Sequence, residues 1–254
     1  MSSRNGNGNG NACPPACADC RLRATGAFTP VTPEQLAFIQ SMRSDTVRVE
    51  AGRTLLPEYR SGDKLYTLYD GWAFRYKTLS DGRRQILNFL LPGDFIGLQE
   101  EFADGHGHGV DAVTDISLCV FPTEKLWDLF RTHPKLGYDV TWLAAREEDM
   151  IDESLLTAGR RSAIERVAML LIHLYRRAER VGLAVDGAIK FPFTQEHIAD
   201  ALGLSLVHTN KTLRRLHHLG LHQIREGQLR LLNAQALESI GDYSLRPLRQ
   251  VPLI

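Results

Sequence analysis

The sequence is short of three things: long apolar runs, net charge and cysteine. No stretch approaches the roughly 18 consecutive apolar residues that a membrane-spanning helix needs. The start of the chain, rich in asparagine and glycine, has neither a basic segment followed by an apolar one nor a cleavage pattern. No Ser/His/Asp combination and no phosphate-holding glycine loop stands out. These absences argue against a membrane or secreted protein, so we expect a cytosolic location.

The 30 basic and 30 acidic residues cancel, but they are unevenly spread along the 254 residues. Positions 31–159 hold 13 basic and 21 acidic residues, whereas positions 160–232 hold 12 basic and 6 acidic ones. This asymmetry is expected when one domain meets phosphates and another does not. An uneven surface without function is the alternative. With 43% hydrophobic residues, the chain can form two modest cores.

The residue pattern in the first half of the chain is typical of a β protein. Residues 1–12 have almost nothing apolar to bury and should be disordered. A short amphipathic helix is expected over 34–43. From Val47 to Phe121, glycines about every ten residues separate short apolar or alternating runs, which predicts antiparallel strands in a sandwich or barrel. Asp81 and Gly82 favour a hairpin, with further turns at 70–71 and 92–94.

Helical periodicity follows over positions 133–158. Apolar residues recur there at intervals of three and four, at Leu136, Val140, Leu143, Met150, Ile151 and Leu155. One narrow apolar seam on so long a helix suits pairing with a symmetry mate. Packing against the chain's own barrel is the alternative for the N-terminal half of the seam. A break is expected at Gly159, and a second helix over Ala163–Arg180.

Positions 194–232 have the pattern of a DNA-reading element. Thr194 can cap a helix that ends at Gly203, and Ser205 can cap a second helix. Along and just before that helix lie residues suited to bases and phosphates: Ser205, Val207, His208, Asn210, Lys211, Arg214 and Arg215. After Gly220, alternation across Glu226 and Gly227 predicts a hairpin wing that carries Arg225. An αα-hairpin with a solvated charged face is the alternative.

Taken in order, these segments resemble the Crp/Fnr transcription regulators, from about Cys17 to Leu232. The resemblance implies an α+β fold: a cyclic-nucleotide-binding-like β-roll (jelly roll), a long dimerisation helix and a C-terminal winged helix-turn-helix. It divides the chain into a cysteine-bearing tail (1–30), the β-roll (31–132), the dimerisation helix (133–158) and the DNA-binding domain (159–254). It implies a homodimer on palindromic double-stranded DNA that activates transcription with RNA polymerase, and no enzyme activity.

The same resemblance places Val207, Asn210 and Lys211 at the family's base-reading positions. Family members usually have Glu, Ser or Gly, and Arg there. Asn can pair with adenine and Lys can reach guanine, but Val207 cannot accept a hydrogen bond from cytosine as Glu does. We therefore expect duplex binding with an altered target sequence.

The sensor's ligand is not expected to be cyclic AMP. Relatives that bind cyclic nucleotides hold the phosphate with a Gly-Glu pair and an arginine followed by Ser or Thr, late in the β-roll. The equivalent stretch here, positions 97–113, has no arginine, and its acidic residues would repel a phosphate.

The four cysteines suggest metal or redox chemistry instead, because disulfides are disfavoured in a reducing cytosol. Iron–sulfur clusters typically take four thiolates. The oxygen-sensing branch of the family holds a [4Fe-4S] cluster, and Cys17, Cys20 and Cys119 match its ligand positions. Its remaining tail ligand falls on Gly26, so Cys13 or an outside group would have to complete the set. Zinc, a thiol switch, a simply buried Cys119, or a small-molecule, haem or protein signal are the alternatives.

Two further hypotheses concern acidic and histidine residues. The acidic run of Glu147, Glu148, Asp149, Asp152 and Glu153 is either a region where two copies repel each other or a solvated face. A barrel could also belong to a cupin-like metal enzyme, with His106 and His108 as half of a metal site. The flanking glycines favour a loop there, and no histidine follows until His133.

Overall fold

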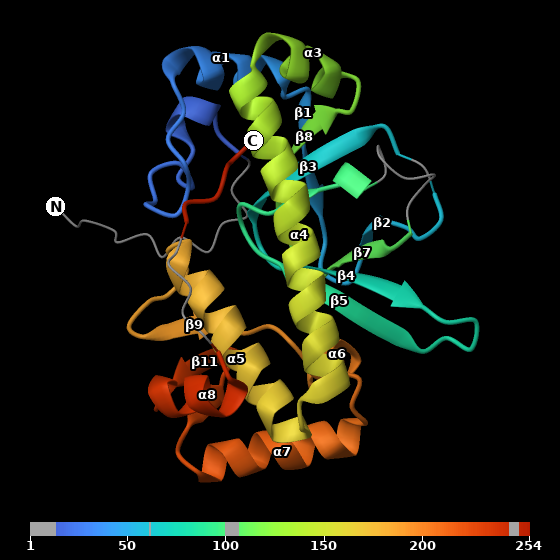
Figure 1. Ribbon diagram of the computed structural model, residues 1–254, viewed down its shortest axis with the longest axis vertical. Coiled ribbons are helices and arrows are strands. Elements are labelled where there is room, and N and C mark those ends of the chain that lie inside the picture. The colour runs from blue at the N-terminus through green and yellow to red at the C-terminus, as the bar shows by residue number, and fades with distance from the viewer. Residues whose placement is uncertain (1–13, 61, 100–106, 244–248) are drawn as a thin grey trace, which may run out of the picture.

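The computed structural model describes residues 14–60, 62–99, 107–243 and 249–254 (Figure 1). The disorder expected for residues 1–12, the candidate ligand Cys13 and His106 lie outside these ranges. After a 3-10 turn at Cys17–Asp19, helix α1 spans Pro33–Met42, close to the expected positions. No described helix combines the length and hydropathy that a membrane crossing requires.

Eight strands form two four-stranded antiparallel sheets that face each other as a β-roll. The first sheet has the order β1-β8-β3-β6 and the second the order β2-β7-β4-β5. The strands are β1 (Asp45–Val49), β2 (Thr54–Leu56), β3 (Lys64–Asp70), β4 (Ala73–Thr78), β5 (Arg84–Leu90), β6 (Phe95–Ile96), β7 (Gly109–Ala112) and β8 (Ile116–Pro122). The turns at 70–71, 81–82 and 92–94 fall where they were expected. At the β4–β5 hairpin Gly82 has φ +86°, a conformation that glycine adopts without strain.

Three helices connect the roll to the C-terminal part. They are α3 (Lys125–Thr132), α4 (Pro134–Arg160) and α5 (Ala163–Arg180). The expected break at Gly159 is wrong, because α4 continues past it. The chain turns two residues later, where the hydroxyl and backbone of Ser162 form a capping box with Glu165 that starts α5.

The C-terminal part is built around two capped helices and a small sheet. Its elements are β9 (Ala188–Lys190), α6 (Gln195–Leu202), α7 (Leu206–His218), β10 (His222–Arg225), β11 (Gln228–Leu231) and α8 (Ala234–Gly241). Helices α1 and α3 lie at one end of the molecule and α7 at the other (Figure 1). The sensor-like and DNA-reading parts are therefore separated along the length of α4.

One hydrophobic cluster joins the roll to the C-terminal part. The outer face of β4–β5 contributes Trp72, Phe74 and Phe89, and these pack with Phe193 and the buried faces of α5, α6 and α7. The rings of Phe89 and Phe193 lie 4.3 Å apart. An ion pair between Arg84 and Asp200 reinforces this contact. The two parts therefore share a core and are not linked by the chain alone.

The apolar seam expected on α4 does not lie on one free face. Leu136, Val140 and Leu143 are buried within the protomer, where they pack with the N-terminal segment and β3. The dimerisation role predicted for these three is therefore wrong, because contacts with their own chain already cover them. Of the six seam residues, only Ile151 and Leu155 are exposed, and Leu155 is 70% exposed.

Both ends of the described chain pack against the roll. Phe28 forms a parallel bridge with Val251, and Leu253 and Ile254 are buried in the same cluster as Cys17 and Leu22. The hydroxyl of Thr67 on β3 donates a 2.6 Å hydrogen bond to the carbonyl of Ile254. Residues 251–254, which follow the DNA-reading part in the sequence, are buried against the sensor part.

Candidate nucleic-acid interface

Helices α6 and α7 cross at a glycine turn that their sequence specifies. The Thr194 hydroxyl accepts from the backbone N–H of His197 at the start of α6. Gly203 ends the helix with φ +61°, and its N–H donates to the Ala199 carbonyl. The Ser205 hydroxyl then accepts from the His208 N–H and starts α7. Both caps are those the sequence predicts.

The buried face of α7 holds two polar residues that the sequence analysis did not assign. Leu213 and Leu216 are buried with α5 and α6. Thr209 and Thr212 are also buried, and the Thr212 hydroxyl bonds back to the His208 carbonyl. Short β-branched side chains let α7 approach α6 closely, although neither threonine fits an apolar pattern.

The opposite side of α7 is an exposed basic face. The predicted contact residues exposed along it are Ser205, Val207, His208, Lys211, Arg214 and Arg215. Val207 at the N-terminal end is 65% exposed. Since the cations lie further along the helix than the N-terminal polar groups, bases and phosphates could be met by different parts of one surface.

Asn210 is placed differently from the others. Its side chain is half-buried, and its amide nitrogen donates to the side-chain carbonyl of Gln195 at 2.8 Å. Gln195 is exposed at the first position of α6 and was missed in the sequence. Its place directly after the capping Thr194 was the signal that could have found it, because the first residue of a capped helix is exposed and polar here.

The wing is a three-stranded sheet in which β9 pairs with the expected β10–β11 hairpin. Glu226 and Gly227 both have positive φ, as a two-residue hairpin turn requires. Arg225 is exposed next to this turn and forms an ion pair with Glu226 at 3.1 Å. Both side chains are largely exposed, so the pair is weak and leaves Arg225 able to exchange partners.

The three described cysteines come together, although about a hundred residues separate Cys119 from the others. Cys17 is buried, Cys20 and Cys119 are half-buried, and all three are free thiols in one cluster. Burial raises the pKa of Cys17 and of Cys119, against the lowering effect of the Arg43 guanidinium. These two thiols are therefore mostly protonated at neutral pH, whereas a metal takes thiolates.

The described cysteines do not fit a prepared metal site. Within residues 14–60, 62–99, 107–243 and 249–254, no group of three or more His, Cys, Asp or Glu side chains could hold a metal ion. His108, one of the two histidines of the cupin hypothesis, is buried before β7. For the iron–sulfur hypothesis, the only further cysteine in the sequence is Cys13, outside the described ranges.

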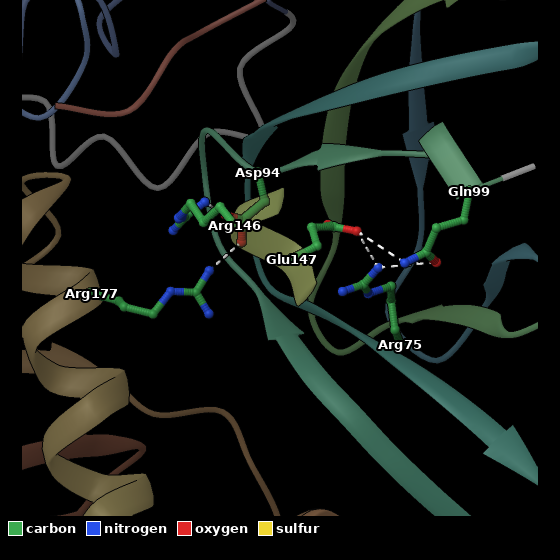
Figure 2. A network of polar contacts seen from close by, with 6 residues as sticks. All are labelled: Arg75, Asp94, Gln99, Arg146, Glu147 and Arg177. Carbon is green, nitrogen blue, oxygen red and sulfur yellow. Dashed lines mark hydrogen bonds and ion pairs between the residues drawn. The ribbon is translucent and has the colours of Figure 1, made fainter. Parts of the chain in front are cut away.

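The acidic run on α4 is only partly a free acidic surface. Glu147 is buried and pairs with Arg75 of β4 at 2.6 Å, within reach of Gln99 (Figure 2). Glu153 pairs with Arg161. Glu148, Asp149 and Asp152 remain exposed. These three, and in part Glu153, can repel a second copy or face solvent, whereas Glu147 is turned to Arg75 and fits neither hypothesis for the run.

Two capped helices crossing at a glycine, an exposed basic face and a three-stranded wing define a winged helix-turn-helix protein. The sequence matches the Crp-like helix-turn-helix domain over residues 165–240 and the cyclic nucleotide-binding domain over residues 46–133. The chain belongs to the Crp/Fnr family of transcription regulators. It is a DNA-binding transcription regulator and not an enzyme.

Similar proteins support this assignment along most of the chain. The chain is 30% identical to the nitrogen fixation regulation protein FixK of Bradyrhizobium diazoefficiens, covering 89% of this chain and 93% of the relative. It is also 30% identical to the transcriptional activator protein FnrL of Cereibacter sphaeroides, covering 90% and 93%. The solved structure of FixK2 from Bradyrhizobium japonicum matches with a TM-score of 0.70 and 30% identity, over 77% of this chain and 96% of that one.

Proposed function

We propose that this regulator is a cytoplasmic homodimeric activator that binds a palindromic duplex site through α7 and works with RNA polymerase. The exposed basic face of α7, next to the wing, carries the proposal. Similarity to a relative named as a transcriptional activator supports the direction of regulation. Asn210 would read a base after exchanging its bond to Gln195, and Lys211 would reach guanine. Arg214, Arg215 and Arg225 would meet phosphates.

The dimer would form through the exposed stripe of α4. Tyr138, Ala145, Glu148, Asp152 and Leu155 are exposed and recur at intervals of three, four and seven residues. Such spacing places them along one side of a helix, as pairing of two long helices requires. Two copies of α7 could then enter successive major grooves about 34 Å apart.

Binding to a set of palindromic duplexes at several salt concentrations tests this function. We expect Arg214→Ala to weaken binding to all sequences and to reduce the salt slope by about one counterion. Lys211→Ala should also relax the preference at one base pair, at a cost of about 1–3 kcal/mol. Arg131→Ala is the matched control, because Arg131 is exposed on α3 at the far end of the molecule. The absence of salt-sensitive duplex binding would refute the proposal.

For the signal, the iron–sulfur hypothesis keeps Cys17, Cys20, Cys119 and Cys13 as its ligands. The gathering of three cysteines supports it, and the absence of a prepared ligand set in the described ranges counts against it. We therefore derive no step of regulation through a cluster. Iron and sulfide analysis of protein purified with and without air decides the matter. Iron-free, colourless protein from both preparations would leave a thiol, small-molecule or protein signal.

A further inference from the structure

A cavity of about 590 Å³ lies where the parts of the molecule meet. Its walls come from β5 of the roll, from α4, and from α5, α6 and the end of α8 in the DNA-binding part. Helices α4 and α5 form the two sides of a V joined near α7 (Figure 1). The proposed DNA contacts on α7 and the cysteine cluster lie elsewhere, so this cavity is a separate site.

One end of the cavity is rich in arginine. Arg146 and Arg177 share a single carboxylate, that of Asp94, whose oxygens lie 3.4 Å and 2.5 Å from them (Figure 2). Arg180 lines the same end, and its guanidinium donates to the backbone carbonyl of Arg249. Two guanidinium groups therefore share one buried carboxylate, and Arg180 at the same end forms no ion pair with a carboxylate of the described residues.

The pKa of His173, which lines the cavity, is also affected by these positive charges. Its pKa is lowered to about 3, first by desolvation and then by the charges of Arg177 and Arg146, against the effect of Asp94. Burial, and the charge of Arg146, also lower the pKa of Arg180. Desolvation is the larger cause of both shifts, and the arginine charges that add to it are the charges that an added anion would meet.

The other walls are apolar. Phe89, Met150, Met169, Leu170 and Leu174 line the cavity, and they come from the sheet and from both helices. The carboxylates that also line it are Asp149, Asp152, Glu153 and Asp242. Glu153 is held by Arg161, and Asp149 and Asp242 are exposed to solvent, where their charges are screened. Asp152 is exposed as well and belongs to the proposed dimer stripe. The enclosed part thus combines a cationic end with an apolar body.

We propose that this cavity binds a small amphipathic organic carboxylate. The carboxylate would lie among Arg146, Arg177 and Arg180, because a guanidinium matches its geometry with paired hydrogen bonds. The apolar body would extend between α4 and α5. A ligand in this cavity would contact β5, α4 and α5 at the same time. It would therefore favour the conformation of this structure, in which the three elements have these relative positions.

Octanoate and 1-octanol are the probes, because they share a chain length and differ in charge. Isothermal titration calorimetry of the full chain without DNA should show one octanoate per protomer and at least tenfold weaker binding of octanol. Trp142 lines the cavity, so octanoate should also change tryptophan fluorescence. No octanoate binding up to about 10 mM, or equal affinity for both probes, would overturn the proposal.

Two variants separate the charge from the apolar walls. Arg180→Gln should weaken octanoate binding about tenfold and leave octanol unchanged. Leu170→Trp should fill the space and abolish binding of both, with His173→Phe as a second filling variant should the first not fold. Arg160→Gln is the control, since Arg160 is exposed at the end of α4 outside the cavity. An Arg180→Gln protein with unchanged octanoate affinity would contradict the assignment of the charged end.

The regulatory consequence rests on the proposed DNA-binding function. If DNA favours this arrangement too, octanoate and DNA must change each other's affinity by the same factor. A duplex titration with and without octanoate measures that factor. Because the calorimetry uses no DNA, its failure is distinguishable from a failure of the chain to bind a duplex.

Discussion

At the scale of single residues, the buried charges lie where the parts of the protein meet. Neighbouring residues on α4 point opposite ways: Arg146 towards Asp94 and Arg177, and Glu147 towards Arg75 (Figure 2). Burial alone would raise the pKa of Asp94, but the charges of Arg177 and Arg146 outweigh it and lower that pKa. Breaking such a buried group leaves uncompensated charge, which typically costs about 3–5 kcal/mol.

Arg75 places a buried cation in the roll, outside the stretch that was expected to lack arginine. Positions 97–113 have no arginine, and 100–106 of them lie outside the described ranges. Arg75 on β4 is nevertheless buried in the roll, and two of its guanidinium nitrogens have no hydrogen-bond partner among the residues that the structure describes. Sequence patterning does not predict this burial, because an arginine in an alternating strand is ordinarily assigned to the solvent side.

The pKa of His173 predicts how stability depends on pH. Since the folded pKa is about 3 and the ordinary value is 6.5, the unfolded chain binds a proton between these limits and the folded chain does not. Stability should therefore fall as pH drops from 6.5 towards 3, by about 1 kcal/mol per pH unit from this group. His173→Gln should reduce that slope in urea unfolding at pH 6.5 and 5. Equal slopes for both proteins would contradict it.

At the scale of elements, different sides of α4 face different surroundings. Leu136 and Val140 hold the N-terminal segment and the roll, Met150 faces the cavity, and Leu155 faces solvent. A single apolar seam in sequence is thus divided among separate contacts, because a helix of 27 residues passes several elements along its length.

Leu155→Lys tests the dimer stripe. If α4 pairs with its copy there, two added cations would face each other, and sedimentation should show a shift towards monomer. The fold itself should be unaffected, because Leu155 makes little contact within the protomer. Leu79→Lys, in the exposed β4–β5 turn, is the control and should leave the oligomeric state unchanged. An unaltered dimer in Leu155→Lys would rule out this stripe.

At the scale of the whole molecule, the sensor and DNA-reading parts are joined at two places. The outer face of β4–β5 shares a core with α5, α6 and α7. Residues 249–254 also return to the cluster that holds Cys17. The end of the chain is therefore packed in the same cluster as Cys17. A structural change at the cysteines can alter the position of these last residues without being transmitted along α4.

Leu253→Ala tests this return of the chain. Removing a buried leucine should cost about 2–5 kcal/mol of stability and leave a cavity beside the cysteines. We expect Cys17 to react faster with a thiol reagent at neutral pH in this variant, as measured by mass spectrometry of the labelled peptide. Val185→Ala is the control, because Val185 is 70% exposed in the DNA-binding part. Unchanged Cys17 reactivity would show that the Leu253 side chain is not needed to cover the thiol.

The sequence alone determined the elements and their order, because local rules set them: the caps Thr194 and Ser205, the turn at Gly203, the glycine-spaced strands and the period of α4. It also determined which side of α7 carries Lys211 and Arg214. Only the tertiary structure decided that Leu136 is buried, that Glu147 meets Arg75, that Gln195 holds Asn210, and that three cysteines and three arginines gather. Those facts depend on contacts between segments far apart in the chain. The periodicity of one segment cannot predict them, because it depends only on residues within that segment.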